Sequence, residues 1–177
     1  MTFKRWLPTF LAFPLGGLLA IGTVGSLDGP LSAAAGGLLA GAVIGAGQWL
    51  ALRPRGIGRR WVAYTGAAMA AGTALAAAVT GAGTELEDLM FTGLVAGAAV
   101  GAAQSTLLAR GRRAAAAWTG VSAAAWSLGW LATSQVIVDI ERGHHVFGAS
   151  GAAIATLVTG LALKALLTAP RGVTPAG

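Results

Sequence analysis

Long apolar segments alternate along the chain with short polar connections. Each of six segments can supply the roughly 20 apolar residues with which a helix spans the hydrocarbon core of a bilayer. They cover residues 7–27, 31–52, 61–82, 89–109, 114–138 and 146–168. The pattern predicts an all-α fold: a polytopic membrane bundle of six transmembrane helices that forms one domain over residues 1–177. The third and fifth segments are rich in Ala, so they insert less favourably per residue than a Leu-rich segment.

The charged residues divide between the two sides of this predicted bundle. Every one of the 12 Lys and Arg residues except Arg142 lies on one side, and all 6 Asp and Glu residues lie on the other. Cytoplasmic connections of membrane proteins are enriched in Lys and Arg. We therefore expect both termini in the cytoplasm. The acidic residues on the outer side are Asp28, Glu85, Glu87, Asp88, Asp139 and Glu141.

The net charge of +6 does not indicate a nucleic-acid partner. The basic residues lie in short connections beside the membrane, where orientation explains them. There we expect them to attract anionic lipid head groups, so the expected partners begin with the lipid bilayer itself. The chain has no Cys, which excludes disulfides and thiolate chemistry. An excess of Arg over Lys and abundant Ala and Gly are typical of a GC-rich bacterial genome. The expected location is the bacterial plasma (inner) membrane, with the first segment kept as an uncleaved anchor.

Two segments share one spacing of glycine and glutamine. The positions Gly37, Gly41, Gly45 and Gln48 recur 56 residues later as Gly93, Gly97, Gly101 and Gln104. In the segments that follow, residues 63–66 match residues 117–120 at an offset of 54. The predicted repeat unit is a helix, a basic connection and a returning helix, over residues 36–82 and 92–138. Parallel repeats imply a pseudo-symmetry axis along the membrane normal. A third copy, split between residues 146–168 and 7–27, is a further hypothesis.

The glycine spacing places the small residues on one helix face, because residues four apart stack along a helix. Such a face lets a neighbouring backbone approach closely, which drives helix association in lipid. One interpretation is static packing within the chain. The other is a seam for a homo-oligomer or for a membrane-protein partner.

The segment from Gly41 to Arg53 resembles a known motif. It reads Gly-x3-Gly-x2-Gln-Trp-x2-Leu-Arg, which is similar to a repeated motif of small, uncharacterised bacterial multi-pass membrane proteins. The second copy departs from it, since Ser105 replaces Trp and one extra residue precedes Arg110. The similarity covers about residues 36–130. It implies a membrane location and a helical bundle, and no particular chemistry.

Four polar or aromatic residues are candidates for binding a ligand. Gln48 and Gln104 lie about one turn from the cytoplasmic ends of their segments, where amides can bond between helices or contact a ligand. Trp126 and Trp130, four residues apart near mid-span, can form an aromatic wall for an apolar ligand, or face lipid and fill space. The other tryptophans are expected in the aromatic belt at the cytoplasmic interface. They are Trp6, Trp49, Trp61 and Trp118.

One outer connection gathers weak candidates for metal ligands. These are Asp139, Glu141, His144 and His145. Their types suit zinc or nickel, but their spacing matches no known metal signature, so we interpret them as a hydrated loop. The Gly148-x-Ser150-Gly151 string resembles the nucleophile motif of rhomboid proteases, yet no His follows it to activate the Ser. We therefore predict neither an enzyme nor a cofactor.

The sequence favours a structural or accessory helix bundle, which can be oligomeric. The alternative is a small carrier, or the substrate-binding subunit of a transporter, for an uncharged or apolar molecule. The chain's length and six segments resemble the binding components of vitamin importers. No charged residue lies near the centre of any segment, which argues against an ion-coupled or proton-coupled pump.

Overall fold

The computed structural model describes residues 3–136 and 148–168. The candidate metal ligands between residues 137 and 147 lie outside this part of the chain. Within it the regular structure is helical. The elements are α1 (Phe3–Trp6), η1 (Leu7–Leu11), α2 (Ala12–Val24), α3 (Pro30–Leu52), η2 (Arg53–Arg55), α4 (Arg60–Thr80), α5 (Leu86–Leu108), α6 (Arg112–Val136) and α7 (Ala149–Thr168). The prediction of an all-α helix bundle is confirmed for these residues.

Local signals in the sequence explain where the helices begin and end. Pro30 stands in the first turn of α3, where its missing N–H costs nothing. The backbone N–H of Gly29 just before it donates to Ser32 Oγ at 3.1 Å. Helix α4 ends at Gly81, whose φ of +64° is the left-handed conformation that glycine adopts readily.

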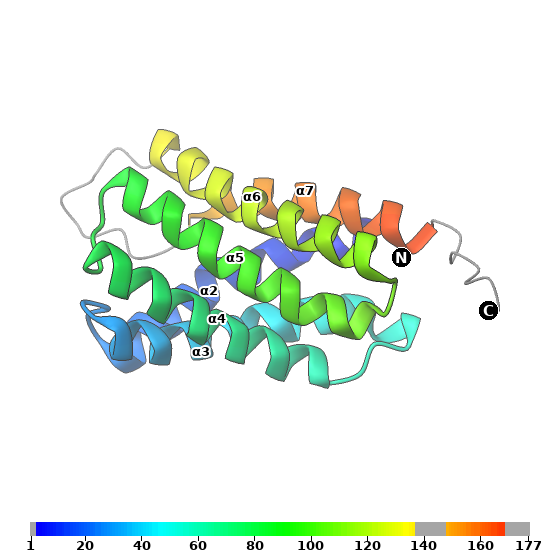
Figure 1. Ribbon diagram of the computed structural model, residues 1–177, viewed down its shortest axis with the longest axis horizontal. Coiled ribbons are helices and arrows are strands. Elements are labelled where there is room, and N and C mark those ends of the chain that lie inside the picture. Colours follow the sequence, from blue (N-terminus) through cyan, green and yellow to red (C-terminus); the bar gives the residue numbers. More distant parts are fainter. Residues whose placement is uncertain (1–2, 137–147, 169–177) are drawn as a thin grey trace.

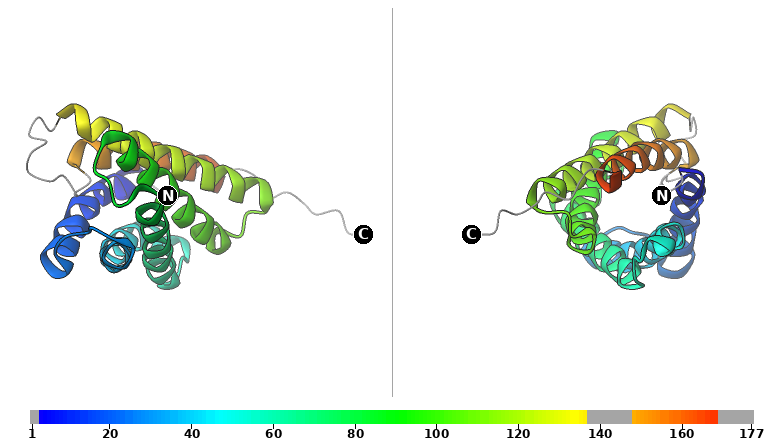
Figure 2. Two further views of the ribbon diagram at one scale, coloured as in Figure 1. Left: turned by 60° about the vertical axis from the view of Figure 1, so that its left-hand side comes forward. Right: turned by 90° about the vertical axis from the view of Figure 1, so that its right-hand side faces the viewer.

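The helices follow one another around a ring (Figures 1 and 2). Helices α3 and α4 form one antiparallel hairpin, and α5 and α6 form the next. The segment from α1 to α2 lies beside α3, and α7 lies beside α6. The first and last helical segments, α1 and α7, meet where Trp6 Nε1 donates to the carbonyl oxygen of Thr156 at 2.9 Å. A six-helix ring of sequential neighbours results from residues 3–136 and 148–168.

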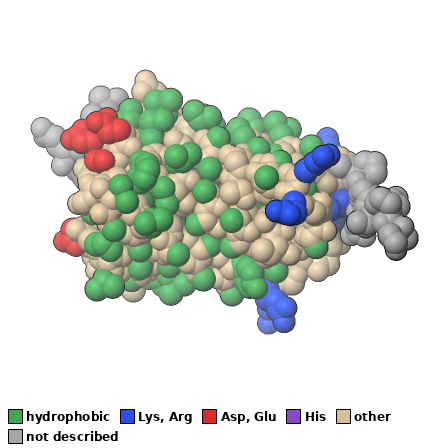
Figure 3. Space-filling view, in the orientation of Figure 1, with side chains coloured by type: hydrophobic (Ala, Val, Ile, Leu, Met, Phe, Trp, Pro, Cys, Tyr) green, Lys and Arg blue, Asp and Glu red, His purple; other side chains and the backbone are tan. Residues whose placement is uncertain are grey.

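Charge and apolar surface are arranged as in a membrane protein. Figure 3 shows acidic side chains at one end of the bundle, basic side chains at the other, and an uncharged wall with hydrophobic patches between them. Large aliphatic side chains point outward along this wall, such as Leu15, Leu31 and Leu161, which are 59%, 88% and 56% exposed. Much of the interior is Ala and Gly. This distribution suits lipid, in which bundles are held by close packing of small residues.

Five helical segments are long and apolar enough to cross a membrane. They are Phe3–Val24, Pro30–Arg55, Arg60–Thr80, Leu86–Leu108 and Ala149–Thr168. Helix α6, which corresponds to the predicted span 114–138, is not among them. Its 25 residues are sufficient in length, but Ser, Thr, Gln and Trp lower its hydropathy. The prediction of membrane-spanning helices is supported for five segments, and the sixth crossing stays a prediction.

The two glycine rows lie inside the chain. All six of their glycines are buried. A Cβ added to Gly41 in α3 would lie 2.9 Å from Gly66 Cα in α4, and one added to Gly97 in α5 would lie 2.6 Å from the Ser122 carbonyl oxygen in α6. The rows therefore hold α3 against α4 and α5 against α6. This supports the interpretation as static packing, since both glycine faces are already covered.

The residues that face the two glycine rows do not correspond at the offset of 54 that the sequence match gives. Gly41 faces Thr65, whereas Gly97, 56 residues later, faces Ser122. Thr65 and Ser122 are 57 residues apart, so the offset of 54 between residues 63–66 and 117–120 does not describe the packing. From the glycine to the residue that it faces, the chain is 25 residues long in the second hairpin and 24 in the first, so the second hairpin is one residue longer and not two residues shorter.

Replacing Gly41 or Gly97 with Leu should destabilise the bundle by about 1–3 kcal/mol or more, because backbone atoms already occupy the space that a Cβ needs. Thermal unfolding in detergent measures the effect. The same change at Gly22 or Gly120, where nothing lies within 4 Å, is the control. Equal melting temperatures for buried and control variants would contradict the role of the rows in packing.

Candidate functional site

Gln48 and Gln104 meet in the interior of the bundle. They are 5% and 1% exposed. Gln104 Nε2 donates to Gln48 Oε1 at 2.9 Å and to Thr65 Oγ1 at 2.9 Å. Each glutamine oxygen also accepts an indole N–H: from Trp61 at 3.1 Å for Gln48, and from Trp118 at 3.2 Å for Gln104. We call these five side chains the glutamine network.

The donors and acceptors of this network fit one another. An indole nitrogen can only donate, so each tryptophan requires an oxygen from its glutamine. That leaves the Gln104 amide nitrogen with two N–H groups, and both find acceptors. Thr65 Oγ1, which accepts one of them, donates its own proton to the Trp61 carbonyl oxygen at 2.8 Å. The network thus joins α3, α4, α5 and α6 near the basic end of the bundle.

The predicted belt of interfacial tryptophans is wrong for three of its four members. Trp6, Trp61 and Trp118 are 0%, 0% and 1% exposed, so they lie in the interior. Trp49 is partly buried; its Nε1 donates to the Ile57 carbonyl oxygen at 3.1 Å. Position along the chain placed all four near the basic end correctly. It did not reveal which way each side chain points.

The sequence did contain a signal for the network. Trp61 follows Gln48 by 13 residues, and Trp118 follows Gln104 by 14, each across a basic connection. The match between residues 63–66 and 117–120 pairs Trp118 with Tyr64, so it conceals the correspondence between Trp118 and Trp61. In the hypothetical third copy, the position that corresponds to Gln104 is Gly160, 56 residues later. A Cβ on Gly160 would lie 2.5 Å from the Trp6 ring. The third hypothetical copy therefore has a buried tryptophan but no glutamine.

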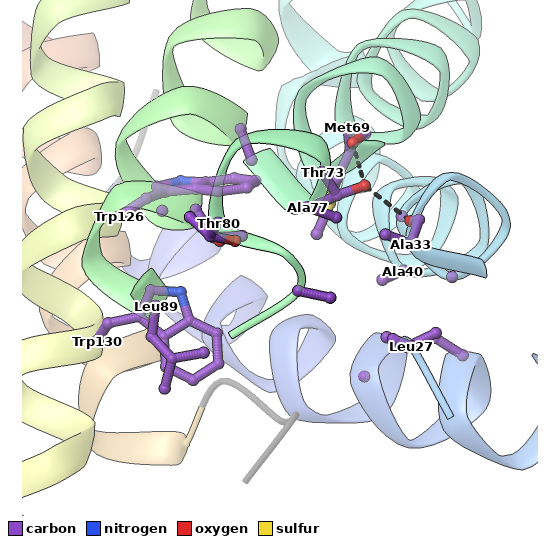
Figure 4. Close-up of a pocket in the computed structure, with 18 of the residues that line it drawn as sticks. Leu27, Ala33, Ala40, Met69, Thr73, Ala77, Thr80, Leu89, Trp126 and Trp130 are labelled. Carbon is purple, nitrogen blue, oxygen red and sulfur yellow. Dashed lines mark hydrogen bonds between the residues drawn. The ribbon is translucent and has the colours of Figure 1, made fainter. Parts of the chain in front are cut away.

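An apolar cavity of about 140 Å³ occupies the acidic half of the bundle. It extends from the connection between α4 and α5 inward to Ile44 and Met69. Figure 4 shows Leu27, Leu89 and Trp130 among the side chains around it. The remaining lining residues are Phe13, Gly17, Ala20, Ala33, Gly36, Gly37, Ala40, Thr73, Ala77, Thr80, Ala82, Gly83, Thr84, Thr92, Gly93, Ala96 and Trp126.

The wall of this cavity offers few free polar groups. None of its described lining residues is charged. Thr73 Oγ1 lies 2.8 Å from the carbonyl oxygens of both Ala33 and Met69, and Thr80 Oγ1 donates to Ala76 at 3.0 Å. The backbone thus uses these hydroxyl protons. Trp126 is held edge-on by Phe13, with ring centroids 5.4 Å apart, and presents an aromatic surface.

The structure separates the four candidate ligand-binding residues into two places. Trp126 and Trp130 both line the cavity, whereas Gln48 and Gln104 belong to the glutamine network and are absent from the lining. Phe91 and Tyr64, the expected aromatic companions, are 36% and 42% exposed and do not line it. Phe13 takes that place. Its position in the first segment gave no sign of this contact.

The candidate metal ligands and the histidines near the protease-like motif lie outside the described residues. In residues 3–136 and 148–168 no three His, Cys, Asp or Glu side chains gather as metal ligands would. Ser150 Oγ, the candidate nucleophile, lies 3.4 Å from the Ala132 carbonyl oxygen of α6. His144 and His145 lie outside the described residues.

Comparison with known proteins gives no relative: the chain matches no family model, no curated protein and no solved structure. The geometry of the glutamine network and of the cavity therefore carries the functional proposal.

Replacing Gln104 with Leu should cost about 2–4 kcal/mol, because it leaves the Trp118 indole N–H without an acceptor and removes the hydrogen bonds that Gln104 donates to Gln48 and Thr65. Trp118→Phe should cost about 1–3 kcal/mol, because it leaves the buried Gln104 oxygen without a donor. Unfolding in detergent measures both, and the exposed Gln135→Leu is the control. In NMR spectra the Trp61 and Trp118 indole protons should exchange slowly with water. Rapid exchange of both would contradict the network.

Proposed function

We propose that this chain is a membrane-embedded binding protein for a small uncharged or apolar molecule, either as a small carrier or as the substrate-binding subunit of a transporter. The observation that carries the proposal is the cavity of about 140 Å³ with apolar and aromatic walls. A dry apolar cavity of about 150 Å³ in another protein holds benzene. The volume here suits a ligand, or part of one, of similar size.

The two halves of the bundle differ in a way that suits binding from one side. The cavity reaches the acidic-end connections through Ala82, Gly83 and Thr84. Towards the basic end, the glutamine network joins the two hairpins. Passage through the protein would require the hydrogen bonds from Gln104 to Gln48 and Thr65 to break. A binding subunit needs no such step, whereas a carrier acting alone does.

A structural or accessory role is the second candidate. Leu11, Leu15 and Leu18 are 51%, 59% and 61% exposed along one side of the first segment. Such a stripe can face lipid, a second copy of the chain, or another membrane protein. In that case the cavity would be a packing defect without a ligand.

For the location we propose the plasma membrane of a bacterium, with six crossings and both termini in the cytoplasm. The separation of charge between the two ends of the bundle supports this orientation (Figure 3). The basic end would then contact anionic lipid head groups.

The orientation can be tested by labelling single cysteines, because the chain contains none of its own. In intact cells a membrane-impermeant maleimide should label Thr84→Cys, at the acidic end, and should not label Gly58→Cys until the cells are opened. Ser134→Cys near the end of α6 should label like Thr84→Cys if α6 crosses the membrane. Labelling of Gly58→Cys in intact cells would reverse the orientation.

Filling the cavity should weaken ligand binding without unfolding the bundle. We expect the protein in nanodiscs to bind fluorobenzene saturably, as followed by ¹⁹F NMR. Ala77→Leu, which adds three carbons at the cavity wall, should weaken this binding by about tenfold or more. Ala78→Leu is the matched control, since Ala78 is exposed on the outside of the same helix. Identical binding by both variants would mean that the probe merely dissolves in lipid.

A further inference from the structure

Acidic residues adjoin, along the chain, the residues that line the acidic end of the apolar cavity. Three cavity-lining residues at the acidic end, Leu27, Thr84 and Leu89, each have an acidic neighbour in the chain. These neighbours are Asp28, Glu85 and Asp88. Asp88 also lies against Gly83, another lining residue, since a Cβ on Gly83 would overlap the Asp88 carboxylate.

The acidic residues of α5 do not all face the same way. Asp88 is half-buried and stands four residues before Thr92, which lines the cavity. Glu87 lies on the side of Phe91 and Leu94, which are exposed. The positive-inside rule, by which Lys and Arg gather on the cytoplasmic side of a membrane, accounts for acidic residues at this end of the bundle. It does not explain why Asp88 adjoins the cavity.

No positive charge opposes these carboxylates among the described residues. The Lys and Arg residues of this part of the chain precede α2, follow the basic end of α3 or α5, or lie in the last turns of α7. Behind the mouth, Trp126 and Trp130 present aromatic surface, which attracts cations as well as apolar groups. Apolar walls also strengthen the electric field of charges that surround a cleft.

We infer that the cavity receives a cationic amphiphile, a molecule with a small apolar or aromatic body and one positive charge. The body enters between the tryptophans and the apolar helix faces, while the charge stays at the mouth beside Asp28, Glu85 and Asp88. This inference rests on the proposed binding function, and it replaces the uncharged or apolar ligand proposed there with a cation that carries an apolar body.

Three probes of similar shape separate charge from shape. Benzyltrimethylammonium is the cation, neopentylbenzene is its uncharged isostere, and phenylacetate is an anion with the same ring. Binding is measured by calorimetry to the protein in nanodiscs of zwitterionic lipid, with empty nanodiscs as the blank. We expect the cation to bind about tenfold more tightly than the isostere in low salt. That advantage should shrink in about 0.5 M salt, and phenylacetate should bind most weakly.

Variants in α5 test whether the preference for the cation arises at the mouth of the cavity. Asp88→Asn should lower the affinity for the cation about fivefold or more and leave the affinity for neopentylbenzene unchanged. Glu87→Gln is the matched control, because it removes the same charge from the same first turn of α5 at an exposed position. If Asp88→Asn fails to fold, Glu85→Gln at an exposed position replaces it.

The outcomes distinguish this inference from the function on which it rests. Equal affinity for the cation and its isostere, with no effect of Asp88→Asn, overturns the inference and leaves the binding function standing. Equal losses of affinity for the cation in Asp88→Asn and Glu87→Gln also overturn it. The effect would then come from the general negative charge at the start of α5 and not from a carboxylate at the mouth of the cavity. Absence of binding by every probe, with no difference between Ala77→Leu and Ala78→Leu, overturns both.

Discussion

Close approach of helix backbones at glycine is the constraint on which the rest of this structure depends. Inside lipid, moving apolar side chains from lipid to the protein interior does not drive helix association. Helices are held instead by close van der Waals contact between faces made of small residues. Gly41 and Gly97 allow such contact in the two hairpins, and a single methyl group at either would collide with backbone. The same closeness brings the start of each returning helix near enough for an indole to reach a glutamine.

The glutamine network and the cavity are two consequences of this packing at opposite ends of the bundle. Near the basic end, the indoles of Trp61 and Trp118 bond to the glutamines, and Gln104 uses both of its N–H groups. Towards the acidic end, Gly37 and Gly93 also border the cavity, where missing side chains leave room. A cavity that reaches the acidic-end connections suits binding from the acidic side.

Sequence reasoning identified the members of the site but not their grouping. Gln48 and Gln104 stood out because they are polar residues in apolar segments at matched positions, and Trp126 and Trp130 because of their spacing. Joining all four in one ligand site was not supported, because the glutamines bond to each other and to indoles while the tryptophans line the cavity. Each glutamine has a partner on a different helix, and nothing local in the chain specifies which residue that is.

The sequence by itself determined the helices, their approximate ends and the division of charge between the two sides. These properties depend on hydropathy, turn residues and charge within about 20 neighbouring positions, and such local patterns persist whatever the helices pack against. The tertiary structure alone decided that three tryptophans turn inward, that the hairpins pack at an offset of 57 residues, and where a cavity remains. Those outcomes depend on how each helix is rotated and shifted against its neighbours. A difference of one residue turns a side chain by about 100° around its helix, which is enough to move it from lipid to the interior.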